Sequence, residues 1–221
     1  MGQAAKNLLL FVSALFPIVN PLGSAPIFLA MTSFYDANTR KALSWRIAVN
    51  SFFLLIGSYL IGAHILSFFG ISLPVVQVGG GLIVISAGWA MLKQKDDDPR
   101  SDLHHQASTQ DPFRNAFYPL TLPLTVGPGS ISVAVTLGAN ASPHIGVNLL
   151  LSILTATLAC ALVAISVFIC YGFADRLARI LGPTGMTVIL RLSSFLLVCI
   201  GVQILWNGAS ALLTSLAAHV R

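Results

Sequence analysis

The chain has 221 residues, of which 56% are apolar and only 9% are charged. Soluble domains carry about 25% charged residues, so this composition cannot cover a globular surface with solvated side chains, and a water-soluble enzyme is excluded. The net charge of +5 does not indicate binding to nucleic acid, because the basic residues lie in short connectors and form no basic face with interleaved aromatic residues.

Apolar stretches long enough to cross a bilayer recur along the chain. A helix needs about 20 residues to span the hydrocarbon core. Six stretches meet this length, at residues 8–31, 47–69, 71–92, 117–137, 145–171 and 187–216. The sequence therefore predicts an all-α polytopic membrane protein with six transmembrane helices, and the lipid bilayer is its first expected partner.

The connectors between these stretches differ in their content of Lys and Arg. Nine basic residues lie in the connectors after the first, third and fifth stretches, and two lie on the opposite side, in the terminal segments. Cytoplasmic connectors carry the excess of Lys and Arg, so both termini are expected on the periplasmic side of an inner membrane. The longest connector, residues 93–115, is expected to be a solvated cytoplasmic linker, with a metal or regulatory site among its Asp and His residues as the alternative.

The linker divides the chain into two parts of three stretches each, residues 1–92 and 116–221. In the first and fourth stretches, residues 17–24 (PIVNPLGS) align without a gap on residues 123–130 (PLTVGPGS), at a shift of 106 positions. An odd number of spans in each part means that the second part must lie inverted in the bilayer relative to the first. The sequence therefore predicts two inverted three-helix repeats, with access alternating as one repeat rocks against the other.

The third and sixth stretches also align, at a shift of 113 positions, which places Gly81 on Ser194 and Gly88 on Gly201. These small residues recur every seven positions. They are therefore expected to form a stripe on one helix face, where a second helix can approach closely.

Proline and glycine are expected to interrupt the first helix of each repeat. Proline removes a backbone N–H and glycine tolerates positive φ, so breaks are predicted at residues 20–24 and 127–130. Backbone groups left bare at membrane depth cost on the order of several kcal/mol unless protein, water or a ligand satisfies them. Inverted repeats that each open with an interrupted span are typical of secondary transporters, whose site lies where the breaks meet. Two proline kinks that only shape the bundle are the alternative.

These residues resemble the MarC family of bacterial and archaeal membrane proteins, also described as small neutral amino acid transporters. The most specific matching segments are residues 20–28 (NPLGSAPIF), 119–123 (PLTLP) and 127–131 (GPGSI), and the resemblance covers nearly the whole chain. It implies six spans in an inner membrane and, for some members, transport of glycine- or alanine-like amino acids. An association of members with multiple antibiotic resistance leaves export of drugs or other small metabolites as the alternative function.

A small zwitterion needs one group that binds its carboxylate and another that binds its ammonium. Half-helix N-termini offer N–H donors to a carboxylate, and freed carbonyls and hydroxyls accept from an ammonium. Arg191 is the one basic residue well inside an apolar stretch, and it is a further candidate to bind the carboxylate. The alternatives are that its side chain extends to the cytoplasmic interface or makes a structural bond to a carbonyl. The expected substrate-binding residues are therefore Asn20, Pro21, Gly23, Ser24, Thr125, Gly127, Gly129, Ser130 and Arg191.

No catalytic residue, resident cofactor or metal ligand is expected. A hydrolase would need a nucleophilic serine beside a histidine base. Ser210 and His64 are present, but nothing in the sequence places a serine next to a histidine. No Asp or Glu lies inside a predicted span, so a carboxylate proton relay is absent. Coupling to Na⁺, coupling to H⁺ by another route and uncoupled transport are the alternatives, and no oligomeric state follows from the sequence.

Overall fold

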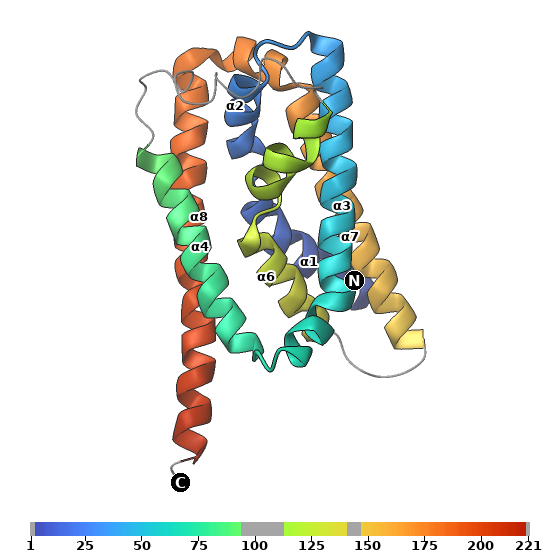
Figure 1. Cartoon of the computed structure of the whole chain (residues 1–221), viewed down its shortest axis with the longest axis vertical. Coiled ribbons are helices and arrows are strands. Elements are labelled where there is room, and N and C mark those ends of the chain that lie inside the picture. The colour runs from blue at the N-terminus through green and yellow to red at the C-terminus, as the bar shows by residue number, and fades with distance from the viewer. Residues whose placement is uncertain (1–2, 94–112, 141–146, 220–221) are drawn as a thin grey trace.

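The computed structural model describes residues 3–93, 113–140 and 147–219, and each element within these ranges is a helix (Figure 1). The predicted all-α fold is therefore confirmed, while most of the predicted linker, at 94–112, lies outside the described residues. The elements in chain order are α1 (Gln3–Val19), α2 (Pro21–Met31), α3 (Ala37–Phe68), α4 (Leu73–Lys93), the short 3-10 turn η1 (Arg114–Ala116), the π-type helix η2 (Phe117–Thr125), α6 (Pro128–Ala139), α7 (Val147–Gly172) and α8 (Ala174–His219).

The described helices provide up to six membrane spans. Five helical segments are long and apolar enough alone. A sixth span requires two helices taken together, Phe117–Thr125 and Pro128–Ala139, which are bent by 64° at the break between them. Counting this pair as one span gives the six that the sequence predicts. The five helical segments that qualify alone are Ala5–Met31, Ala37–Phe68, Leu73–Lys93, Leu149–Gly172 and Ala174–Ala217.

α3 begins well before its apolar stretch because Asp36 caps its N-terminus. The Asp36 carboxylate accepts hydrogen bonds from the backbone N–H of Asn38 at 3.1 Å and of Thr39 at 3.4 Å. The Thr39 hydroxyl donates to the same carboxylate and, as the main cause, lowers the pKa of Asp36 below its ordinary value. Hydropathy detects only the apolar part of such a helix, so the predicted start at residue 47 is ten residues late.

α8 turns sharply near its start. Gly182 has φ 66° and ψ 178°, a conformation that is essentially restricted to glycine, and Pro183 follows it. Residues 174–181 therefore cross one end of the molecule before the rest of α8 runs along α4, as the orange and red ribbon in Figure 1 shows.

Arg40 connects three elements at this end of the molecule. Its guanidinium lies 2.8 Å from the Asp175 carboxylate at the start of α8, with a side-chain exposure of 14% for the arginine. The same guanidinium donates to the carbonyl oxygens of Thr32, at 3.2 Å, and Tyr35. It thereby joins the end of α2 and the start of α3 to the start of α8 through charge-assisted hydrogen bonds.

The two halves of the chain interleave rather than form separate bodies. The main contacts between helices join a helix of the first half to one of the second: α4 with α8, α3 with α6 and α7, α1 with α7, and α2 with α8. α4 and α8 lie side by side along one flank (Figure 1), and they meet the other helices mainly through α6 and α2. The described helices of both halves therefore build one helical bundle.

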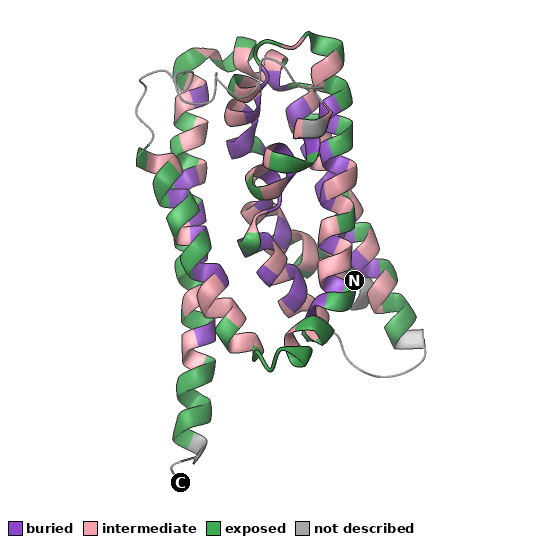
Figure 2. Cartoon of the chain, in the orientation of Figure 1, coloured by how far each residue is buried: buried purple, intermediate pink, exposed green. Residues whose placement is uncertain are grey.

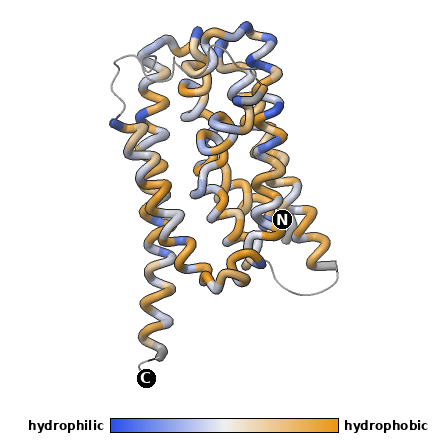
Figure 3. Tube along the Cα trace, in the orientation of Figure 1, coloured by the Kyte–Doolittle hydropathy of each residue, from blue (hydrophilic) through white to orange (hydrophobic). Residues whose placement is uncertain are grey.

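The surface of the bundle is apolar, as lipid requires. Large apolar side chains such as Phe53, Leu150 and Trp206 are more than half exposed, whereas buried residues concentrate on helix faces that point into the bundle (Figure 2). Hydrophilic residues gather mainly at the end that holds the α2–α3 and α7–α8 connections (Figure 3). This distribution is that of a membrane protein, while the orientation of the termini stays a prediction.

Small residues bring α4 and α8 into backbone contact, as the predicted stripe requires. A Cβ atom added to Gly81 would lie 2.7 Å from the Gly201 carbonyl oxygen, and one added to Gly88 would lie 2.9 Å from the Ser194 carbonyl oxygen. Both distances are shorter than any normal Cβ contact, so only glycine fits at these positions. The predicted close approach is confirmed.

Candidate functional site

Asn20 interrupts the first span. It adopts the left-handed conformation with φ 49° and ψ 55°, and its side-chain oxygen accepts a hydrogen bond from the Gly23 N–H at 3.2 Å. Pro21 has no N–H to give to the Pro17 carbonyl. The interruption is narrow, because backbone bonds from Asn20 to Phe16 and from Ser24 to Asn20 bridge it at 2.9 and 3.0 Å. The first break is therefore a local defect in one continuous span.

The same asparagine carries a buried, unpaired donor. Its Nδ2 atom has no hydrogen-bond partner among the described residues. An unpaired buried N–H costs roughly 1–3 kcal/mol, which is recovered when an acceptor occupies the space beside it. The first break therefore offers a hydrogen-bond donor to an oxygen atom of a ligand.

The second break is wide. Val126 and Gly127 are extended between η2 and α6, and no side chain caps the N-terminus of α6. The Ser130 hydroxyl turns back to donate to the Gly127 carbonyl at 2.9 Å. The partial positive charge of the α6 N-terminus is thus placed inside the bundle, where it favours a negatively charged group.

Tyr171, near the end of α7, connects the two breaks. Its hydroxyl lies 3.0 Å from the Thr125 hydroxyl, at the end of η2, and the Ser24 side chain on α2 lies close to it. The ring is 1% exposed and stacks on Phe28 with a centroid separation of 4.5 Å. Sequence reasoning missed this residue, because it lies at the end of an apolar stretch and only tertiary packing shows its partners.

The glycines of the predicted site mediate helix packing. A Cβ atom on Gly23 would overlap Ser193 on α8, and one on Gly129 would overlap Val84 on α4. A Cβ atom on Gly127 would meet only the Pro123 carbonyl, at 3.3 Å. Gly23 and Gly129 therefore allow each interrupted span to approach one helix of the α4–α8 pair.

Arg191 lies on a different face of α8 from the residue that meets the first break. Its side chain is exposed on α8, two positions before Ser193, which faces Gly23. Residues two positions apart on a helix point in different directions. The structure thus brings Asn20, Gly23 and Ser24 to one helix break and Thr125, Gly127 and Ser130 to the other, without placing Arg191 on the helix face that meets them.

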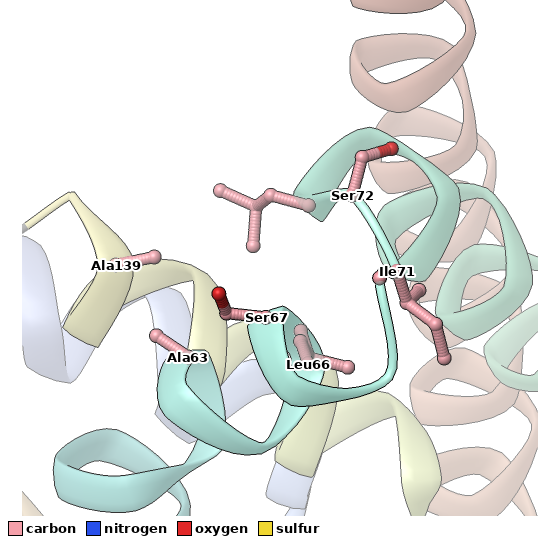
Figure 4. A pocket seen from close by; sticks show the side chains of 8 residues that line it. Ala63, Leu66, Ser67, Ile71, Ser72 and Ala139 are labelled. Atoms are coloured by element: carbon pink, nitrogen blue, oxygen red, sulfur yellow. The ribbon is translucent and has the colours of Figure 1, made fainter.

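A hollow of about 330 Å³ lies at a distance from this site, at the turn between α3 and α4 (Figure 4). It is lined by small and apolar side chains, and its polar side chains are those of Ser67 and Ser72. None of the predicted substrate-binding residues lines it. The hollow therefore has no part in the candidate site.

The bundle, its lipid-facing surface and its two interrupted spans define a polytopic helical membrane protein. The chain belongs to the MarC family, since the sequence profile described as "MarC family integral membrane protein" matches residues 5–213.

Several relatives cover nearly the same length. The inner membrane protein MarC of Salmonella typhimurium is 32% identical over 213 residues, which cover 94% of this chain and 96% of the relative. The membrane protein YvbG of Bacillus subtilis is 30% identical over 200 residues, covering 90% and 91%, and YhcE of Escherichia coli is 29% identical over 209 residues, covering 93% of each. No solved structure matches the chain.

Proposed function

We propose that the protein is a secondary transporter of the inner membrane that carries small neutral amino acids, of the glycine and alanine type, by alternating access. The observation that carries the proposal is the position of Tyr171, whose hydroxyl lies 3.0 Å from Thr125 of one interrupted span and close to Ser24 of the other. Interrupted spans whose backbone and short polar side chains meet inside the bundle are typical of transporter sites.

The chemistry of the cluster suits a zwitterion. The Asn20 amide and the uncapped N-terminus of α6 supply donors for a carboxylate. The hydroxyl oxygens of Ser24, Thr125 and Tyr171 supply neutral acceptors for an ammonium group. Close packing at Gly23 and Gly129 restricts the space beside both breaks, which favours an amino acid over a bulky drug.

Packing between the halves supports the inverted-repeat interpretation. Gly81 meets Gly201, and Ser194 meets Gly88. The alignment of the third and sixth stretches places Gly81 on Ser194 and Gly88 on Gly201, so each of these two contacts is the counterpart of the other. A two-fold relation between the repeats would require this correspondence. A further pair of contacts behaves in the same way. Gly23 approaches Ser193, and the residue aligned with Gly23, Gly129, approaches the residue aligned with Ser193, Gly80.

The interleaved contacts change the expected motion. Rocking of one repeat against the other would separate α4 from α8 and α3 from α7. We therefore assign the alternation of access to movement of the α4–α8 pair against the remaining helices. Each connection into this pair holds a glycine with positive φ, Gly70 with φ 67° and Gly182 with φ 66°, and these positions are suited to act as hinges.

Gly182→Ala is expected to slow exchange several-fold with little change in KM. A Cβ atom there meets nothing within 4 Å, so the substitution acts only through the backbone, at a strain of about 1–3 kcal/mol. Initial exchange rates in proteoliposomes measure the effect. Gly79→Ala, in the regular part of α4 and equally free of contacts, is the matched control. A Gly182→Ala variant as fast as the Gly79→Ala control would refute the hinge.

Combined Ser24→Ala and Ser130→Ala substitution is expected to weaken exchange of labelled alanine about tenfold or more, because each change removes a polar group at a break. Counterflow into proteoliposomes loaded with unlabelled alanine measures it. Ser166→Ala is the matched control, since that hydroxyl also donates to the carbonyl three residues earlier, Val163, but belongs to α7 and not to either interrupted span. Equal exchange by the double variant and the control would contradict the site.

Absence of exchange in folded wild-type protein would favour another solute, with drug export tested next.

A further inference from the structure

Tyr171 occupies a position that fixes the direction of its hydrogen bonds. The Thr125 hydroxyl donates its hydrogen to the Leu120 carbonyl at 2.7 Å. It therefore acts as acceptor in its 3.0 Å contact with the Tyr171 hydroxyl, which is the donor. The phenol hydrogen is thus directed toward Thr125, and the phenol oxygen keeps its lone pairs as an acceptor, with the Ser24 side chain close to it.

The ring itself is held in place by packing. Tyr171 is 1% exposed, and its ring lies 10° from parallel with that of Phe28 on α2. Because the ring is fixed and its hydrogen is occupied, the phenol oxygen is an oriented, uncharged acceptor between the two breaks. Such an acceptor can bind an N–H donor, but it has no free hydrogen to donate to a carboxylate.

We propose that the Tyr171 oxygen, together with Ser24, binds the ammonium group of the substrate and thereby determines specificity for a primary amine. This inference rests on the proposed transport function and adds to it the residue that distinguishes an amino acid from the corresponding hydroxy acid. Asn20 and the N-terminus of α6 then remain for the carboxylate.

Tyr171→Phe removes the hydroxyl and keeps the stacked ring. We expect the KM for alanine in counterflow to rise roughly ten- to hundredfold, the loss expected for one hydrogen bond to a charged group, with a smaller change in the maximal rate. Lactate, which has a hydroxyl in place of the ammonium, should compete weakly with alanine in the wild type. The preference for alanine over lactate should fall in the variant by about the same factor as alanine binding.

Tyr35→Phe is the matched control, because the Tyr35 hydroxyl is also buried but has no hydrogen-bond partner among the described residues. This control should keep both the KM and the preference of the wild type. An unchanged KM and preference in Tyr171→Phe would overturn the proposal while leaving alanine exchange, and with it the proposed function, intact. Lack of exchange by the wild type would instead refute the proposed function.

A second variant keeps the test decisive if Tyr171→Phe does not fold. Thr125→Val preserves the shape of the side chain but removes the acceptor that orients the phenol hydrogen. The hydroxyl is then free to rotate and donate to other groups, so the preference for alanine over lactate should fall by a smaller factor. An unchanged preference in folded Thr125→Val would also overturn the proposal.

Discussion

Asn20→Asp is expected to reduce alanine exchange roughly ten- to hundredfold in folded protein. The change keeps a side-chain oxygen to accept from the Gly23 N–H and a residue type that tolerates the left-handed conformation. It replaces the buried, unpaired Nδ2 donor with an oxygen atom. A substrate carboxylate then loses a hydrogen bond to a charged group, which contributes roughly 1.5–3 kcal/mol. Counterflow of labelled alanine at several concentrations measures the loss.

Asn20→Gly provides an independent check on the same position. Glycine also adopts positive φ, and its replacement of a capping asparagine costs only a few tenths of a kcal/mol. It removes the donor without adding an acidic group, so exchange should again fall. The same substitution at Asn140, an exposed asparagine at the end of α6, should have no effect. Full exchange by either Asn20 variant would show that the Nδ2 donor does not bind substrate.

Gly129→Ala is expected to lower both the stability of the protein and its exchange activity, because the new methyl group overlaps Val84 on α4. Overpacking of this kind costs roughly 1–3 kcal/mol. Val84→Ala removes the overlapping atom, so the double variant should regain the thermal midpoint and exchange rate of Val84→Ala alone. Thermal unfolding in detergent and counterflow measure the two properties. A double variant that is stable but inactive would contradict the packing role and place Gly129 among the substrate contacts.

The sequence predicts the spans and breaks well because both depend on local chemistry. Apolar length identifies each span, and the absence of an N–H in Pro21 and Pro128 acts wherever these residues occur. The spacing of Gly81 and Gly88 likewise identifies the helix face that meets α8. These properties belong to short segments and survive folding unchanged.

Features that depend on tertiary contacts could not be predicted from the sequence. Nothing in the sequence around Tyr171 shows that its hydroxyl meets Thr125, a residue 46 positions earlier in the chain. The difference between the narrow break at Asn20 and the wide one at Gly127 also depends on neighbouring helices, since both segments hold similar residues. The interleaving of the halves follows from the packing of whole helices, which no local sequence pattern reveals.

The central claim is that this bundle exchanges small neutral amino acids across the membrane. Its most direct test is counterflow of labelled glycine and alanine in proteoliposomes that contain the purified wild-type protein, with and without a Na⁺ gradient. We expect saturable exchange of both amino acids, and the gradient identifies or excludes coupling to Na⁺. Absence of exchange of glycine, alanine and other small neutral amino acids, in protein shown to be folded, would contradict it.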